Sequence, residues 1–194
     1  MESSDKQQLK SLIVYYSATG NTKKVAEAIY DALLNEKVDS TLCRVQDASG
    51  KELYDYDLVF LGSPSYEWLP AAPMMRFIKD KLKLHRDRGD VKLCAPKVPG
   101  KTAVVFCTYS GPHTGINEST TAGKYMAQLF EHLGFDIAAE WYVVGEFQNW
   151  QEASTIGRLG DIRGRPNEED LAKVRKDVSR LVRSILAKSR RLSI

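Results

Sequence analysis

The feature that most constrains the fold is an alternation along the chain between short apolar runs of strand length and longer segments with helical periodicity. This alternation is typical of a parallel β-sheet covered by helices on both faces. Strands are predicted at residues 12–16, 40–45, 58–61, 102–107 and 136–144, and helices at 22–34, 73–84, 118–133 and 168–187. We therefore predict an α/β fold with a doubly wound, five-stranded parallel sheet in the order 2-1-3-4-5, arranged as a three-layer sandwich.

Residue types at the helix ends agree with these boundaries. Pro73 suits the first turn of its helix, and Gly134 suits a C-terminal cap. Asn167, followed by three acidic residues, is a good N-terminal cap for the last helix. Two long connections interrupt the alternation, a charged one at 85–100 that begins with His85 and another at 146–165. Connections of this length are often functional.

Length and composition indicate one folded domain. We expect it to span residues 1–194, with a polar N-terminal tail at 1–8 and a basic C-terminal tail at 188–194. A content of 43% hydrophobic and 27% charged residues is that of a globular chain. The net charge of +3 is too small to indicate nucleic-acid or membrane binding. Without a membrane-length apolar run or a secretory signal pattern, the chain is expected in the cytoplasm.

The three cysteines, Cys43, Cys94 and Cys107, include no Cys-x-x-Cys pair, which argues against a disulfide framework and a zinc site. Cys43 and Cys107 fall in strand patterns, so we predict that they are buried thiols rather than redox-active groups. No set of His, Cys, Asp or Glu shows ligand spacing, and no metal site is expected.

The segment from Leu12 to Thr22 is a strand that runs through a hydroxyl-rich turn into a helix. The first N–H groups of a helix have no intrahelical partner and can hold a phosphate without Lys or Arg. Alternatively, the hydroxyls of the turn only cap the helix. The turn lacks the motifs of a P-loop and of a dinucleotide fold, and the strand at 58–61 does not end in the Asp of a receiver domain. The turn consists of Ser17, Ala18, Thr19, Gly20, Asn21 and Thr22.

Residues 13–22, continued by Ala26 and Ile29, resemble the FMN-phosphate signature of the flavodoxin family at every position. The resemblance implies a flavodoxin-like fold and an FMN-binding flavoprotein that acts in electron transfer. It also implies that the turn at 17–22 wraps the phosphate and that two later strand-end loops wrap the isoalloxazine ring. The candidates in these loops are Ser63, Pro64, Ser65, Tyr66 and Trp68 in one, and Thr108, Tyr109, Ser110, Gly111, His113 and Gly115 in the other.

Aromatic side chains in these loops are candidates for stacking on a flat ring. Trp68 and Tyr66 are alternatives in the second loop, and Tyr109 is the candidate in the third. His113 is the candidate catalytic residue, because a histidine in a flavin loop can hydrogen-bond the ring or a quinone and titrates near neutral pH. The alternative is an exposed histidine without such a role.

Residues 110–171 are similar, in part, to the tryptophan-repressor-binding-protein (WrbA) family of NAD(P)H:quinone oxidoreductases. The similarity rests on Ser110 to Glu118, on His132-Leu133-Gly134 and on Gly160 to Leu171. It implies NADH or NADPH as electron donor, and a homo-oligomer in which a neighbour's loop, here 146–165, covers the ring. The second loop differs: it reads Pro-Ser-Tyr-Glu-Trp at 64–68 and lacks the Arg of that family.

Two functions of different classes remain. The first is an FMN-dependent redox protein with a small-molecule or protein partner, either an electron carrier or an NAD(P)H:acceptor oxidoreductase. Carriers of the flavodoxin type are usually acidic, so the slightly basic charge favours the enzyme. The second is a flavin-free binding or regulatory module on the same fold, against which the intact phosphate turn argues.

Overall fold

The computed structural model describes residues 8–192, with side chains described as far as Lys188. Residues 1–7 and 193–194 of the two predicted tails lie outside the described residues. Five parallel strands form the sheet, in the order β2-β1-β3-β5-β6. This confirms the predicted order 2-1-3-4-5. The strands are β1 (Lys10–Tyr15), β2 (Asp39–Arg44), β3 (Leu58–Tyr66), β5 (Thr102–Tyr109) and β6 (Asp136–Val144), and a short β4 (Leu69–Pro70) pairs antiparallel with the end of β3.

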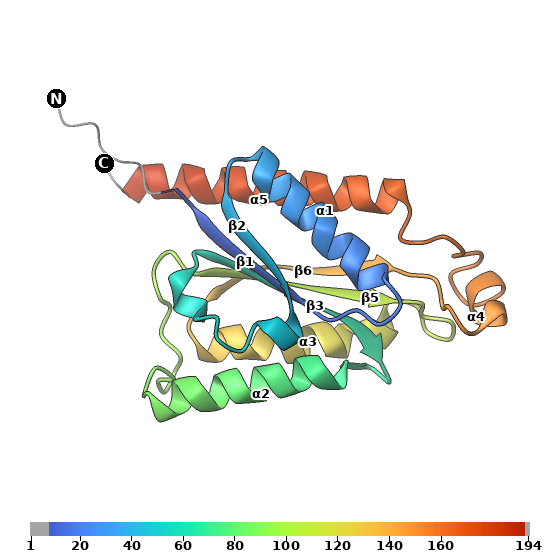
Figure 1. Cartoon of the computed structure of the whole chain (residues 1–194), viewed down its shortest axis with the longest axis horizontal. Coiled ribbons are helices and arrows are strands. Elements are labelled where there is room, and N and C mark those ends of the chain that lie inside the picture. Colours follow the sequence, from blue (N-terminus) through green and yellow to red (C-terminus); the bar gives the residue numbers. More distant parts are fainter. Residues whose placement is uncertain (1–7, 193–194) are drawn as a thin grey trace.

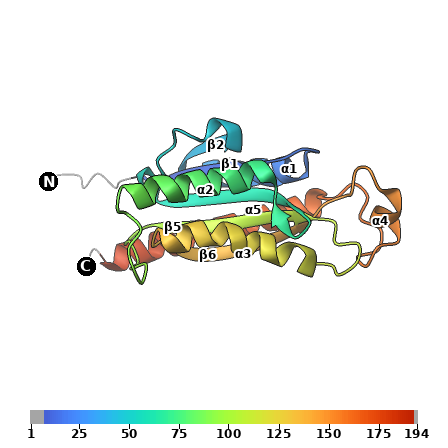
Figure 2. The ribbon, with the colours of Figure 1, turned by 90° about the horizontal axis from the view of Figure 1, so that it is seen from below.

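Helices cover both faces of the sheet, which gives the predicted three layers (Figures 1 and 2). Consecutive strand residues point to opposite faces, so Leu12 and Val14 of β1 join one core while Ile13 and Tyr15 join the other. Both faces are apolar, as expected for a fully covered parallel sheet. One face packs against α1 (Asn21–Asn35) and α5 (Glu168–Leu192), and the other against α2 (Ala72–Asp87) and α3 (Asn117–His132).

Strand β3 is longer than the sequence suggested. The predicted end of this strand at residue 61 is wrong, because the strand continues through Gly62, Ser63 and Pro64 to Tyr66 and returns as β4. Pro64 lies beyond the last β3 residue paired with β1, so its missing N–H leaves no gap in that ladder. The extension carries Ser65 and Tyr66 past the edge of the sheet and positions them for the site described below.

Helix ends follow the predicted residue types. Gly134 adopts a positive φ of 75° directly after α3. At the start of α5, the side chain of Asn167 accepts the N–H of Asp170 at 3.1 Å, and Asp170 accepts the N–H of Asn167 at 3.0 Å. This reciprocal pair is a capping box. The last helix continues to Leu192 instead of ending at Ala187, so most of the predicted basic tail is helical.

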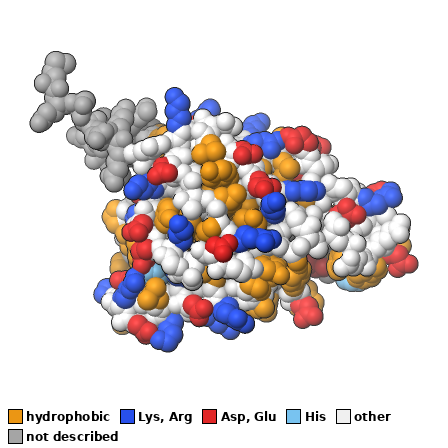
Figure 3. All heavy atoms as spheres, in the orientation of Figure 1, with side chains coloured by type: hydrophobic (Ala, Val, Ile, Leu, Met, Phe, Trp, Pro, Cys, Tyr) orange, Lys and Arg blue, Asp and Glu red, His pale blue; other side chains and the backbone are white. Residues whose placement is uncertain are grey.

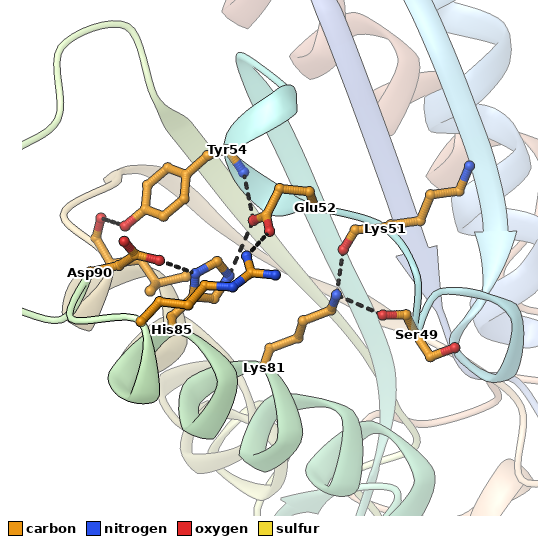
Figure 4. Close-up of polar contacts among 9 residues, drawn as sticks. Ser49, Lys51, Glu52, Tyr54, Lys81, His85 and Asp90 are labelled. Carbon is orange, nitrogen blue, oxygen red and sulfur yellow. Dashed lines mark hydrogen bonds and ion pairs between the residues drawn. The ribbon is translucent and has the colours of Figure 1, made fainter.

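His85 lies in the last turns of α2 and is fully buried, so its predicted place in a charged loop is wrong. The helix runs to Asp87 because His85 finds partners on both sides of its ring (Figure 4). Its Nδ1 lies 2.9 Å from Oδ2 of Asp90, and its Nε2 lies 3.3 Å from Oε1 of Glu52. The ring of Tyr54 packs edge-on against it at 5.2 Å. These contacts fix the connections on either side of α2.

A buried lysine on α2 contacts the connection between β2 and β3. Lys81 is 4% exposed, and its Nζ donates to the backbone carbonyls of Ser49, at 2.8 Å, and of Lys51 (Figure 4). Burial lowers the pKa of Lys81. Together these polar contacts tie the short 3₁₀ helices η1 (Val45–Asp47) and η2 (Leu53–Asp55) to α2.

The remaining expectations concern the thiols and the surface. Cys107 is fully buried and Cys43 is partly buried on the edge strand β2, while Cys94 is exposed. Burial raises the pKa of the Cys107 thiol to about 12, which keeps it protonated at neutral pH. On the face seen in Figure 3, basic and acidic side chains are interspersed. None of the helices within residues 8–192 is long and apolar enough to span a bilayer.

Candidate functional site

A cavity of about 730 Å³ opens at the carboxyl ends of the strands, where ligands of doubly wound folds bind. Its size lies within the range of small-molecule sites. Four loops line it: 17–22 after β1, 64–68 at the end of β3, 108–114 after β5 and 145–150 after β6. The first three are the loops that the sequence singled out.

The loop after β1 has the features of an anion site. Helix α1 begins after Gly20, which adopts a φ of 103°, and no side chain caps its first turn. The Oγ of Ser17 instead accepts the N–H of Gly20 at 3.1 Å. The hydroxyls of the turn therefore do not cap α1 in the structure, in contrast to the alternative considered above. The first turn of α1 holds no acidic residue, and its N–H groups are directed at the cavity end of the helix.

Hydrogen bonds join the first loop to the others. The hydroxyls of Thr22 and Thr108 lie 2.7 Å apart in a buried pair. The side-chain amide of Asn21 donates to the carbonyl of Glu146 at 2.9 Å. Such contacts hold the cavity walls in place before a ligand arrives, which lowers the ordering cost of binding.

The third loop is bound to the start of α3 and to the fourth loop. One carboxylate oxygen of Glu118 accepts the backbone N–H groups of His113, at 2.8 Å, and of Thr114, at 2.6 Å. On the other side, the hydroxyl of Ser110 donates to the carbonyl of Gly145 at 2.7 Å. The loop is therefore held by hydrogen bonds on both sides.

The second loop is a two-residue hairpin with a strained backbone. Glu67 and Trp68 sit between the paired residues Tyr66 and Leu69, and their φ values are 48° and 67°. A two-residue hairpin with both central φ values positive is a type I′ turn, which Asn and Gly usually occupy. Holding residues with a Cβ there costs roughly 1–2 kcal/mol each. The turn places the 62% exposed Trp68 on the cavity wall.

The fourth wall is the first part of the connection 146–165, whose ends are joined. The N–H of Glu146 donates to the carbonyl of Arg165 at 2.8 Å. Inside the connection, the buried hydroxyl of Ser154 in α4 (Gln151–Thr155) bonds the N–H of Phe147 at 2.9 Å. This excursion, with its ends joined, extends beyond the carboxyl ends of the strands in Figure 1. It is part of the same chain as the cavity it lines.

Aromatic rings dominate the open side of the cavity. Trp150 packs against His113 with ring centroids 5.9 Å apart, and against Phe147 at 5.7 Å. Tyr66 and Tyr109 lie on the opposite loops, and burial raises the pKa of both phenols, so both are neutral at pH 7. Within the described part of the chain, no Lys or Arg lines the cavity.

Most of the sequence-predicted site residues are brought together here. Those that line the cavity are Ser17, Ala18, Thr19, Asn21, Thr22, Pro64, Ser65, Tyr66, Trp68, Thr108, Tyr109, Ser110, Gly111 and His113. Gly20, Ser63 and Gly115 are not among the lining residues. The hydroxyl of Ser63 is buried and accepts the N–H of Ala71 at 2.9 Å, and Gly115 closes a turn by donating its N–H to Gly111.

The sequence interpretation missed the fourth wall and Glu118. Phe147 and Trp150 lie in a connection that was assigned to cover the ring of a neighbouring subunit, but they line the cavity of their own chain. The predicted sheet order could have indicated Phe147 and Trp150, because it places the last strand beside β5. The loop after that strand then lies at the same edge of the sheet as the other three loops. Glu118 stands at the end of the WrbA-like segment Ser110 to Glu118, but nothing in the sequence predicted that its side chain holds the third loop. The described part of the chain brings no three metal-ligating side chains together.

A family model described as "Flavodoxin domain" matches residues 12–79, which contain most of β1, the loop after β1 and the hairpin of the second loop. The chain is flavodoxin-like. The "Flavodoxin" of Aquifex aeolicus is 28% identical over 193 residues, covering 89% of this chain and 98% of the relative. The "NAD(P)H dehydrogenase (quinone)" of Archaeoglobus fulgidus is 26% identical over 189 residues, covering 82% of this chain and 88% of the relative.

The fold of this flavodoxin-like chain also has solved counterparts. The structure of a flavodoxin from the domain Archaea superposes with a TM-score of 0.62, covering 91% of this chain and 99% of that one. At 18% sequence identity, this likeness establishes the fold. The expected flavodoxin-like architecture is thus confirmed.

Proposed function

We propose that the chain binds FMN non-covalently in the cavity and works as an electron-transfer flavoprotein of the flavodoxin and WrbA type. The observation that carries the proposal is the uncapped start of α1, which shares one cavity with aromatic side chains from three other loops. An anion site and a set of flat apolar walls match the two ends of FMN. When bound, FMN supplies a ring that accepts and releases electrons.

The residues present fit the phosphate. A phosphate held here is bound by backbone N–H groups of the turn at 17–22 other than that of Gly20, and by the hydroxyls of Ser17 and Thr19, with the helix dipole in place of Lys or Arg. The absence of acidic residues from the first turn of α1 leaves that attraction unopposed.

The residues present also fit the ring. Trp68 and Tyr66 line the cavity from the second loop, and Tyr109 lines it from the third. Trp68 is our first choice for stacking, because the strained turn that displays it has no other evident use. His113 stays the proposed catalytic residue. Its exposed ring packs on Trp150 at the open side, where an electron acceptor would enter.

More specifically, we propose NADH or NADPH as the electron donor and a quinone as the electron acceptor. The name of the Archaeoglobus relative supports them, and the Aquifex relative supports a carrier equally well. The homo-oligomer and the cytoplasmic location stay predictions. The excursion 146–165 already lines the cavity of its own chain. In a homo-oligomer, a neighbour's loop would therefore be added to that wall.

An absorption spectrum of the purified protein and titration of the apoprotein with FMN test the proposal. Flavin absorption and quenching of FMN fluorescence are expected. A colourless protein that leaves FMN fluorescence unchanged would refute the proposal in favour of a flavin-free module. Anaerobic mixing with NADH or NADPH and then a benzoquinone separates enzyme from carrier, since only the enzyme is reduced by a nucleotide.

Replacing Thr19 by proline tests the position of the phosphate. The substitution removes one backbone donor and distorts the turn, and loss of a hydrogen bond to a charged group weakens FMN binding by about 10–100-fold. Titration of FMN fluorescence measures the effect. Thr19→Ser, which keeps both the N–H and the hydroxyl, serves as the control. Equal affinity of Thr19→Pro and wild type would mean that the phosphate lies elsewhere.

A further inference from the structure

Glu118 is the second residue of α3, and it contacts both loops that flank the proposed ring position. Its carboxylate accepts the N–H groups of His113 and Thr114, and the hydroxyl of Thr114 lies 3.4 Å from the same oxygen. Its backbone carbonyl accepts the hydroxyl of Ser65, from the second loop, at 2.5 Å. One residue therefore joins the second loop to the third.

The two contacts are made by different parts of the residue, so they can be separated. Truncating the side chain leaves two backbone N–H groups of the third loop without their acceptor, while the carbonyl that binds Ser65 remains. An amide in place of the carboxylate keeps an acceptor oxygen and removes only the charge.

The charge of Glu118 has no cationic partner in the cavity lining. Of the other two carboxylates in the lining, Glu67 is exposed at the hairpin tip, and Glu146 accepts the N–H of Gly164 at the base of the excursion. Reduction adds negative charge to a flavin, and a fixed carboxylate nearby disfavours the form that carries more negative charge.

We propose that Glu118 is a positioning residue of the cavity, which fixes the third loop for FMN binding and, through its charge, disfavours the reduced form of the cofactor. The proposal rests on the FMN binding proposed above. Glu118 would act on the cofactor through the backbone of the third loop, which it holds, and through the electrostatic effect of its charge.

Amide hydrogen exchange of the apoprotein tests the first half without any cofactor. In Glu118→Ala the amides of His113 and Thr114 are expected to exchange about tenfold faster or more, because they lose their acceptor. In Glu118→Gln they are expected to stay protected. Glu131→Gln, the same charge change at an exposed site on the same helix, is the matched control and should resemble wild type.

FMN affinity and midpoint potential test the second half. Glu118→Ala is expected to weaken binding of oxidised FMN by about tenfold. Glu118→Gln is expected to bind oxidised FMN nearly as wild type does, but to favour the reduced form by about tenfold, the size of a partly screened charge interaction. For a two-electron couple that corresponds to a midpoint potential about 30 mV more positive. Glu131→Gln should change neither quantity.

The outcomes separate this proposal from the proposed function. If wild type binds FMN while Glu118→Gln has an unchanged potential, the charge has no role and the proposal fails. It fails equally if His113 and Thr114 stay protected in Glu118→Ala. If wild type does not bind FMN at all, the proposed function fails, and the hydrogen-exchange result still decides whether Glu118 fixes the loop.

Discussion

Gly62 shows how one residue sets the packing beneath the cavity. It lies on β3 opposite Phe106 of β5, and a Cβ added there would meet the Phe106 ring at 2.0 Å. Both residues are fully buried, so the ring has no free space to move into. Glycine is needed here for the close approach of a side chain and not for a special φ.

Gly62→Ala is therefore expected to destabilise the protein by about 1–3 kcal/mol, the usual cost of overpacking a core. Urea unfolding measures the change in the free energy of unfolding. Gly50→Ala is the control: a Cβ at Gly50 meets nothing within 4 Å, so its effect should stay within about 0.5 kcal/mol. Equal stability of the two variants would contradict the packing around Phe106.

At the scale of elements, helix α5 depends on the capping box formed by Asn167 and Asp170 at its start. The helix packs three fully or nearly buried valines, Val174, Val178 and Val182, against the same core as α1. Asp170 in its first turn is held twice, by the capping interaction with Asn167 and by the guanidinium of Arg165 at 2.9 Å. The cap thus also fixes the end of the excursion that forms the fourth wall.

Asn167→Ala is expected to cost about 1 kcal/mol, because an N–H of the first turn loses its acceptor. Thermal and urea unfolding measure the loss. Ser184→Ala, at an exposed position in the middle of the same helix, should leave stability unchanged. A variant of Asn167 as stable as wild type would mean that Arg165 alone holds the start of α5.

For the whole molecule, ion pairs and the buried Cys107 thiol contribute to the dependence of stability on pH. The Arg165 guanidinium lowers the pKa of Asp170, and the Arg183 guanidinium lowers the pKa of Glu36. Below the usual values of 3.8 and 4.5 the unfolded chain binds more protons than the folded one, so acid favours unfolding. Burial has the opposite effect on Cys107: its pKa is raised from 9.0 to about 12, so stability falls as pH rises above 9.0.

The free energy of unfolding is therefore expected to be highest between about pH 5 and 9, and to decline on both sides. Urea unfolding at a series of pH values measures the curve. Asp170→Asn should reduce the decline on the acid side, and Cys107→Ala the decline on the alkaline side. Asp31→Asn, at an exposed position without an ion pair among the described residues, should leave the curve unchanged. A wild-type curve that stays flat to pH 2 would contradict these shifts.

Several features of this protein could be predicted from the sequence, because they depend on residue types that are close together along the chain. The period of the apolar residues set the strands, the helices and the sheet order, and the hydroxyls and Gly20 of the turn at 17–22 predicted an anion site. Asn167 marked a helix start in the same way. Each of these features depends on residues within a few positions of one another.

Other features were decided by contacts between distant segments. His85 is helical and buried because Glu52 and Asp90 meet its ring, and β3 continues past Gly62 because β5 pairs with it and β4 folds back on it. Glu118 and the wall around Trp150 become part of the site only when loops far apart in the sequence meet at one edge of the sheet. The sequence alone determined the architecture and predicted an anion site in the turn at 17–22. The tertiary structure decided how the cavity is closed, because partners distant along the chain leave no local pattern.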